Sequence, residues 1–171
     1  MAGTALRVVG IDPGSRVTGW GVIESQGSTL TLVEAGCITP NAALPMAKRL
    51  AAILKGLAEI LERTAPHHAA VEEVFFAKNV KSALALGQAR GVALAALAGA
   101  SVEVHEYSPA EVKRAIVGGG RADKEQVAHM VRVLLGPKEK QVHGVRLDVT
   151  DACAIAICHA NTWHSRLRVA G

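Results

Sequence analysis

The chain has 171 residues, of which 50% are hydrophobic and 20% are charged, and its formal net charge is +4. This size suits one domain, and this composition excludes a disordered or fibrous chain, because there are enough apolar residues for a covered core. We therefore expect a single domain over residues 1–171, with a flexible tail over roughly residues 165–171. The mildly positive charge is compatible with a nucleic-acid partner but does not identify one.

The cysteines and the hydropathy pattern indicate the cellular setting. Cys37, Cys153 and Cys158 form neither a Cys-x-x-Cys motif nor an even set, which argues against a disulfide framework and a thiolate zinc site. No uncharged apolar stretch reaches the 18 or so residues of a membrane span, and the N-terminal residues run straight into a strand-like segment. We expect a protein of the reducing cytoplasm that does not associate with a membrane.

Short apolar segments separated by turn residues predict three consecutive strands at the start of the chain. The first strand covers Leu6 to Ile11 and ends at the turn sequence Asp12-Pro13-Gly14-Ser15. The second covers Val17 to Glu24, and the third covers Thr29 to Ile38 after another glycine-containing turn. Because short turns connect them, these three strands are expected to pair antiparallel.

Helical periodicity begins after the third strand and then alternates with further strands. Apolar residues at three- and four-residue steps predict a helix from Met46 to Arg63, which Pro66 ends. The elements expected after it are strands at 68–74 and 101–107 and helices at 82–97, 109–116, 124–135 and from about residue 148 onward. Alternating strands and helices imply parallel strands. We therefore predict an α/β domain with a mixed five-stranded sheet, three antiparallel strands followed by parallel strands, and helices on both faces.

One acidic residue directly follows an apolar predicted strand, and another lies within one. Asp12 directly follows the first strand, although Asp-Pro-Gly is also a common turn sequence and explains Asp12 without any function. Glu72 lies within a strand that a covered sheet should bury, and a buried carboxylate needs a partner or a metal. If the two strands are neighbours, their backbones are about 5 Å apart. Asp12 and Glu72 could then share metal ions.

Two further aspartates, Asp148 and Asp151, start the last predicted helix. Their spacing places both on one face of that helix, although helix capping alone could explain one of them. Four carboxylates without a His or Cys cluster suit Mg²⁺ or Mn²⁺, and two such ions about 4 Å apart could catalyse phosphodiester hydrolysis. The sequence does not decide which of Asp148 and Asp151 binds a metal directly.

Four sequence blocks that contain these carboxylates carry a resemblance to a known family. They are GIDPGSRVTG at 10–19, EEVFFAKN at 72–79 followed by SAL at 82–84, LGQARG at 86–91, and DVTDA at 148–152. Over nearly its whole length the chain resembles the RuvC family of bacterial Holliday junction resolvases, which have an RNase H-like fold. The resemblance implies an endodeoxyribonuclease of DNA recombination and repair that nicks a four-way junction in symmetric pairs and leaves 5′-phosphate and 3′-hydroxyl ends. It places the family's acidic tetrad on Asp12, Glu72, Asp148 and Asp151.

The resemblance also implies residues that contact DNA. Phe75 matches an aromatic residue that contacts bases near the cut, and Lys113 and Lys124 match basic residues that contact DNA. Five more cations could extend the DNA-binding surface by their position in the sequence: Lys78, Lys81, Arg90, Arg114 and Arg121. Core packing is the alternative for Phe75, and a solvated surface is the alternative for each cation.

The helix predicted at 82–97 is apolar on more than one face, so we expect it to be buried on several sides. The resemblance adds that it contributes to a two-fold homodimer interface, which would allow two like-polarity strands to be cut. It also implies cooperation with the RuvA and RuvB branch-migration proteins. His143 lies in the loop before Asp148 and could approach the metals, although an exposed loop histidine is the favoured interpretation. His129, His159 and His164 receive no role.

Three alternatives remain open. The chain could be a junction-binding module without catalysis, although all four carboxylates are present. The sequence of residues 10–15 also resembles the first phosphate loop of actin-like ATPases, but those proteins need a second related domain. A different RNase H-like nuclease, acting on flaps or RNA hybrids, could carry the same tetrad.

Overall fold

The computed structural model describes residues 5–73, 79–119, 122–136 and 147–170, with side chains up to residue 167. In chain order its elements are β1 (Leu6–Asp12), β2 (Thr18–Gln26), β3 (Thr29–Ile38), α1 (Met46–Thr64), β4 (His68–Glu72), α2 (Val80–Gly99), β5 (Glu103–Tyr107), α3 (Pro109–Val117), α4 (Lys124–Leu135) and α5 (Leu147–Ala170).

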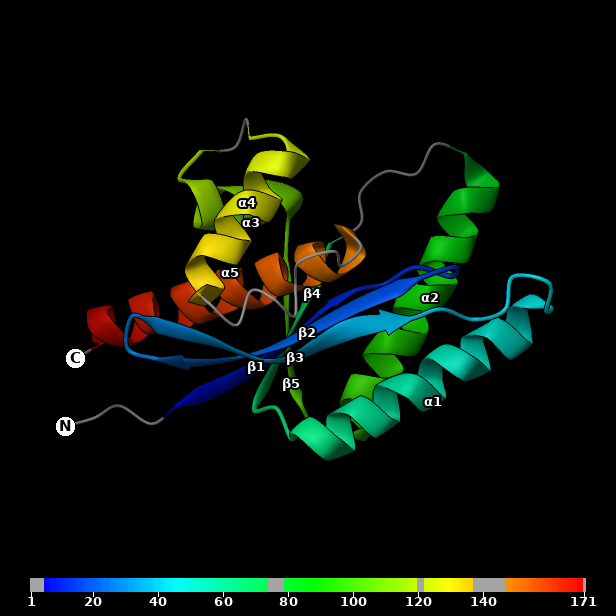
Figure 1. Ribbon diagram of the computed structural model, residues 1–171. Helices are drawn as coiled ribbons and strands as arrows, with labels where there is room; N and C mark the ends of the chain where they lie inside the picture. The colour runs from blue at the N-terminus through cyan, green and yellow to red at the C-terminus, as the bar shows by residue number, and fades with distance from the viewer. Residues whose placement is uncertain (1–4, 74–78, 120–121, 137–146, 171) are drawn as a thin grey trace.

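The five strands form one mixed sheet in the order β3-β2-β1-β4-β5 (Figure 1). β1 pairs antiparallel with β2, and β2 pairs antiparallel with β3. β4 lies parallel to both β1 and β5. The prediction of a mixed five-stranded sheet is therefore confirmed. This topology makes β1 and β4 neighbours, although they are far apart in the sequence.

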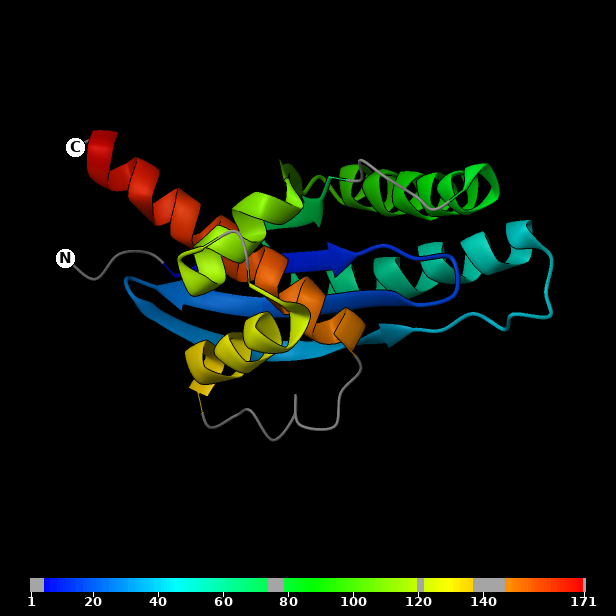
Figure 2. The same ribbon diagram turned by 90° about the horizontal axis from the view of Figure 1, so that it is seen from above.

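Helices cover both faces of the sheet, as predicted. Successive side chains of a strand point to opposite faces, so Val8 belongs to one hydrophobic cluster while Val9 and Ile11 belong to the other. The first cluster includes residues of α3, α4 and α5, and the second includes residues of α1 and α2. Figures 1 and 2 show α5 lying across one face of the sheet with α3 and α4 beside it, and α1 and α2 together on the other face.

Glycines in the two central strands allow α5 to lie close against the sheet. A Cβ added to Gly10 would lie 2.0 Å from the backbone oxygen of Ala152, and one added to Gly19 would lie 2.1 Å from the backbone oxygen of Asp148. A Cβ on Gly21, which pairs with Gly10, would lie 2.4 Å from the Sγ of Cys153. Since no side chain fits in these spaces, the glycines set the depth at which the start of α5 rests on the sheet.

We expect Gly10→Ala to destabilise the protein by about 2 kcal/mol or more, because α5 and β1 must move apart to admit the methyl group. Urea unfolding followed by circular dichroism measures this change. Gly99→Ala is the matched control, since nothing lies within 4 Å of its added Cβ and alanine is the better helix residue. Equal stability of the Gly10→Ala variant and the wild type would contradict this account of the packing.

The expectation that the apolar helix α2 is buried on several sides is wrong for the single chain. Ala89, Ala93 and Leu97 pack into the core formed with α1 and the sheet, whereas Val80 is 85% exposed and Leu84 is 63% exposed. Judged by length and composition alone, α2 is the one helix among the described residues that could cross a membrane. Its packing against α1 is that of a helix in a globular domain, and its first turns leave an apolar surface uncovered.

Three predicted boundaries shift for local reasons. α2 begins at Val80 because the Asn79 side chain caps it by accepting a hydrogen bond from the Ser82 backbone N–H. β5 begins at Glu103 because Ser101, with a φ of 56°, takes the left-handed conformation in the turn after α2. β4 ends at Glu72, which makes that carboxylate the last residue of its strand.

Candidate active site

Asp12 and Glu72 lie side by side at the ends of adjacent parallel strands. Ile11 of β1 pairs with Val71 of β4, so the next residue of each strand, Asp12 and Glu72, ends its strand at the same edge of the sheet. Asp12 is also held from the other side, where it pairs with Gly19 of β2. The neighbouring positions predicted for the two carboxylates are confirmed.

The first two turns of α5 bring Asp148 and Asp151 to this edge. The close approach of the Asp148 backbone to Gly19 places the start of α5 over the start of β2, next to the end of β1. Asp151 accepts a hydrogen bond from Lys124, whose Nζ lies 3.3 Å from Oδ2. Lys124 is the first residue of α4, so this ion pair joins the starts of α4 and α5.

The acidic residues influence one another's protonation. Burial, followed by the negative charges of Asp151, Glu72 and Asp148, raises the pKa of Asp12 from 3.8 to about 7. Burial and then the charge of Asp151 also raise the pKa of Glu72. The charge of Asp151 also raises the pKa of Lys124, which favours the protonated, positively charged form of that lysine. The electrostatic coupling shows that the four carboxylates form one group.

This group has the chemistry of a divalent-cation site. Carboxylate oxygens are the ligands that Mg²⁺ and Mn²⁺ prefer. Among the described residues, the charges that lower the pKa of Glu72 are those of Lys124 and Lys113. Burial and then the neighbouring negative charges disfavour the ionised form of Asp12, and a bound cation would favour it. The residues present therefore fit a divalent metal.

A small cavity opens beside the carboxylates, between α3, α4 and α5. Its volume is about 210 Å³, and its lining includes Glu72, Asp151, Lys113 and Lys124. Both lysines had been predicted to contact DNA, and the structure brings both to the acidic group. A phosphate approaching this side of the site would meet two ammonium groups next to the carboxylates.

A larger groove of about 670 Å³ lies on the other flank, where the β1–β2 loop meets the starts of α1 and α2. Asp148 lines it together with Arg16, Arg49 and the predicted DNA contact Lys81. The guanidinium of Arg49 also donates to the backbone oxygen of Ser15, which ties α1 to the loop. Arg16 and Arg49 were not selected from the sequence. Arg16 lies inside the first motif block and could have been selected there, whereas nothing in the sequence links Arg49 to the site.

Two other predicted DNA contacts, Arg90 and Arg114, line neither of these cavities. Arg90 forms an ion pair with Glu106 of β5, and its Nε lies 3.5 Å from the backbone oxygen of Glu72. Arg114 lines a different cavity, between α3 and the middle of α5, together with Cys158. The remaining candidates lie outside the described residues: Phe75, Lys78, Arg121 and the possible metal neighbour His143.

Known proteins are similar to this chain in sequence and in fold. The family model described as crossover junction endodeoxyribonuclease RuvC matches residues 8–159. The protein of that name from Chloroflexus aggregans is 50% identical over 161 residues, 92% of this chain and 94% of the relative. The one from Pelotomaculum thermopropionicum is 46% identical over 164 residues, 95% of this chain and 98% of the relative.

Solved structures agree with the sequence matches. The structure of T. thermophilus RuvC in complex with Holliday junction substrate superposes with a TM-score of 0.87 at 36% identity, covering 94% of this chain and 96% of that one. The yeast mitochondrial Holliday junction resolvase Ydc2, at 15% identity and a TM-score of 0.71, shares the fold over 96% of this chain and 81% of its own. From the family model and these relatives, the chain belongs to the RuvC family of crossover junction endodeoxyribonucleases.

Proposed function

We propose that this RuvC-family endonuclease resolves Holliday junctions by paired, symmetric nicks in two strands of like polarity, using the carboxylates Asp12, Glu72, Asp148 and Asp151. The observation that carries the proposal is the meeting of these four residues where β1, β4 and the start of α5 converge. The family assignment favours a nuclease over the actin-like ATPase alternative. Hydrolysis that leaves 5′-phosphate and 3′-hydroxyl ends, in recombination and repair, is part of the proposal.

In this proposal the four carboxylates bind the metal cation, and other residues bind the DNA. Asp12 and Glu72 come from adjacent strand ends, and Asp148 and Asp151 complete the oxygen donors from α5. Bound Mg²⁺ or Mn²⁺, which we propose as two ions per site, would supply an activated water and stabilise the leaving oxygen. Asp12 must be ionised to bind a cation, so with its pKa of about 7 the metal and the proton compete for this carboxylate near neutral pH.

Cations on both flanks of the carboxylates supply the DNA contacts in this proposal. Lys113 and Lys124 line the cavity beside Glu72 and Asp151, and Arg16, Arg49 and Lys81 line the groove beside Asp148. A strand that crosses from one flank to the other would pass the carboxylates with its phosphates neutralised on either side. We retain Phe75, Lys78, Arg90, Arg114 and Arg121 as proposed DNA contacts.

Paired nicking requires two active sites, and we propose that α2 contributes to a homodimer interface. The exposed Val80 and Leu84 give the start of α2 an apolar surface that the single chain does not cover. A two-fold axis next to this surface would place two identical sites on opposite sides of a four-way junction. Cooperation with RuvA and RuvB, and a cytoplasmic location, also belong to the proposal.

Leu84→Glu should convert the dimer into a monomer, because a charge would then have to be buried in the contact. Light scattering and sedimentation measure the change in mass. Leu167→Glu is the matched control, since Leu167 is a comparably exposed leucine, at 54% against 63% for Leu84, on α5. An unchanged dimer in the Leu84→Glu variant would show that α2 does not form the interface.

The substrate class is tested with labelled DNA of equal length and different structure. The protein is mixed, with Mg²⁺ or Mn²⁺, with a four-way junction, a linear duplex, a flap and an RNA–DNA hybrid. We expect cleavage of the junction at least about 100-fold faster than that of the other substrates, and none from Glu72→Gln. Faster cleavage of the flap or the hybrid would support a different RNase H-like nuclease. Tight junction binding without cleavage in either metal would support a binding module.

A further inference from the structure

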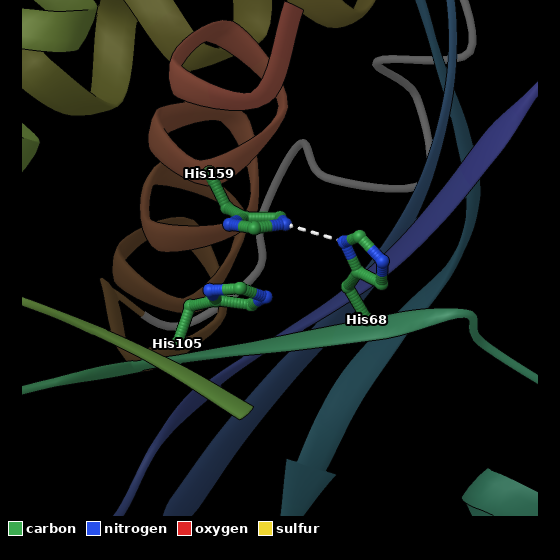
Figure 3. A group of neighbouring side chains, drawn as sticks. All are labelled: His68, His105 and His159. Atoms are coloured by element: carbon green, nitrogen blue, oxygen red, sulfur yellow. Dashed lines mark hydrogen bonds between the residues drawn. The ribbon is translucent and has the colours of Figure 1, made fainter. Parts of the chain in front are cut away.

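Three histidines from distant parts of the sequence converge between the sheet and α5. His68 comes from the start of β4, His105 from the middle of β5, and His159 from α5 (Figure 3). One ring nitrogen of each lies within 4.8 Å of those of the other two. The rings of His105 and His159 are stacked with their centroids 4.3 Å apart, and Trp163 packs edge-on against His68.

The hydrogen bonding of these rings is incomplete. His68 Nδ1 and His159 Nε2 are 2.8 Å apart and share one hydrogen bond. The Nε2 of His105 is buried and has no hydrogen-bond partner among the described residues, although it lies 3.1 Å from Oε1 of Glu103. A buried ring nitrogen that lies near a carboxylate but makes no well-aligned hydrogen bond is only partly satisfied, so packing alone does not account well for this arrangement.

Two of the histidines have a neighbouring group near the ring nitrogen that would not bind the metal. The Nδ1 of His159 lies 2.7 Å from the hydroxyl of Tyr107, and the Nε2 of His68 lies 3.8 Å from Oε2 of Glu103. Histidines that bind a metal through one nitrogen usually donate the other N–H to a carboxylate or another acceptor, which fixes the ring. Tyr107 is already within hydrogen-bond distance of His159, and Glu103 would need to move closer to His68 to accept from it.

The spacing and protonation of the rings also suit a metal. Tetrahedral zinc with Zn–N distances of about 2.0–2.1 Å places its ligand nitrogens about 3.4 Å apart, so the rings need shifts of only about 1 Å. Burial lowers the pKa of His159 to about 3 and also lowers that of His68. Both rings are therefore neutral at pH 7, and neutral imidazole is the form that binds metals.

We propose that His68, His105 and His159 form a transition-metal site, with Zn²⁺ as the favoured ion, separate from the carboxylate site. Imidazole nitrogens select zinc-like ions, whereas the carboxylates select Mg²⁺ or Mn²⁺. His159 follows Asp151 by eight residues of the same helix, or about 12 Å along its axis. The metal would connect β4, β5 and α5. Of these elements, β4 also carries Glu72 and α5 also carries Asp151. Its role is structural, to fix α5 on the strands.

Metal binding is measured directly, without a nuclease assay. The protein is dialysed against EDTA, returned to excess Mg²⁺ to occupy the carboxylates, and titrated with Zn²⁺ by calorimetry and with Co²⁺ by visible absorption. We expect one equivalent of Zn²⁺ to bind, a tetrahedral Co²⁺ spectrum, and an increase in melting temperature. Absence of Zn²⁺ binding in the presence of Mg²⁺ would overturn the proposal.

Variants locate the bound metal. His105→Gln should weaken Zn²⁺ binding at least about 100-fold. Loss of a residue that only hydrogen-bonds to a metal ligand already lowers metal affinity about 10–100-fold, and His105 would be a ligand itself. His129→Gln, at an exposed histidine of α4, should leave binding unchanged. Zinc binding should also persist in Asp12→Asn, and its loss there would assign the metal to the carboxylates instead.

The proposal can be tested even if a histidine variant does not fold. If His105→Gln fails to fold, X-ray absorption of the zinc-loaded wild type still counts the ligands. Three imidazole nitrogens at about 2.0–2.1 Å would support the site. A shell of carboxylate and water oxygens would contradict it. These readings are independent of junction cleavage, so the zinc site and the proposed nuclease function can fail separately.

Discussion

Asp12→Asn is expected to reduce junction cleavage by about 10³-fold or more while leaving junction binding within a few-fold of the wild type. Asp12 is the most strongly coupled of the carboxylates, with charge interactions to Glu72, Asp148 and Asp151. Losing its charge removes a metal ligand, and metal stabilisation of a transition state is worth several kcal/mol, or about 10³-fold in rate. Single-turnover cleavage of a labelled four-way junction measures the rate, and gel shift in Ca²⁺ measures binding.

Glu73→Gln is the matched control for this loss. Glu73 follows Glu72 directly, but its backbone N–H is bonded to the carbonyl of Tyr107 and its charge is not among those that shift the pKa of Asp12. We expect this variant to cleave within about threefold of the wild type. Retained cleavage by Asp12→Asn, or an equal loss in Glu73→Gln, would show that the four carboxylates do not act as the catalytic group.

Stability of the metal-free protein should fall as the pH rises from 5 to 8, and Asp12 should account for about 2–3 kcal/mol of that fall. Its pKa is raised in the folded protein from 3.8 to about 7, so between these values the folded state holds more protons than the unfolded state. Stability then decreases with pH through this window and levels off above pH 7. The raised pKa of Glu72 acts in the same direction.

The measurement compares the wild type with Asp12→Asn by urea unfolding in EDTA at several pH values. The wild type should lose more stability than the variant between pH 5 and pH 8, and the variant should be the more stable at pH 8. Adding Mg²⁺ at pH 8 should then stabilise the wild type more than the variant, because ligands that bind the folded state stabilise it. Parallel pH profiles of the two proteins would contradict the coupling among the carboxylates.

Much of the fold and of the acidic site follows from local sequence patterns. Short turns predict the antiparallel first strands, and alternating strands and helices predict the parallel ones, which together make β1 and β4 neighbours. An acidic residue at the end of each apolar strand then predicts that Asp12 and Glu72 lie together. The three-residue spacing of Asp148 and Asp151 predicts one helical face, although their delivery to the sheet depends on tertiary packing.

The features that the sequence did not predict arise from contacts between distant segments. The place of α5 depends on Gly10 and Gly19, whose missing side chains matter only where a helix backbone lies against them. The apolar composition of α2 predicted burial, but composition does not distinguish a core contact from a surface for another chain. The histidine cluster was missed because His68, His105 and His159 belong to three elements, and no local spacing relates them.

Mapping both nicks on one four-way junction tests the central claim most directly. Each strand of the junction is end-labelled in turn and incubated with the wild-type protein and Mg²⁺, and the products are sized and then treated with DNA ligase. We expect cuts at symmetric positions in two opposite strands of like polarity, with ends that the ligase reseals. A single unpaired cut, cuts in strands of opposite polarity, or ends that the ligase cannot join would contradict it.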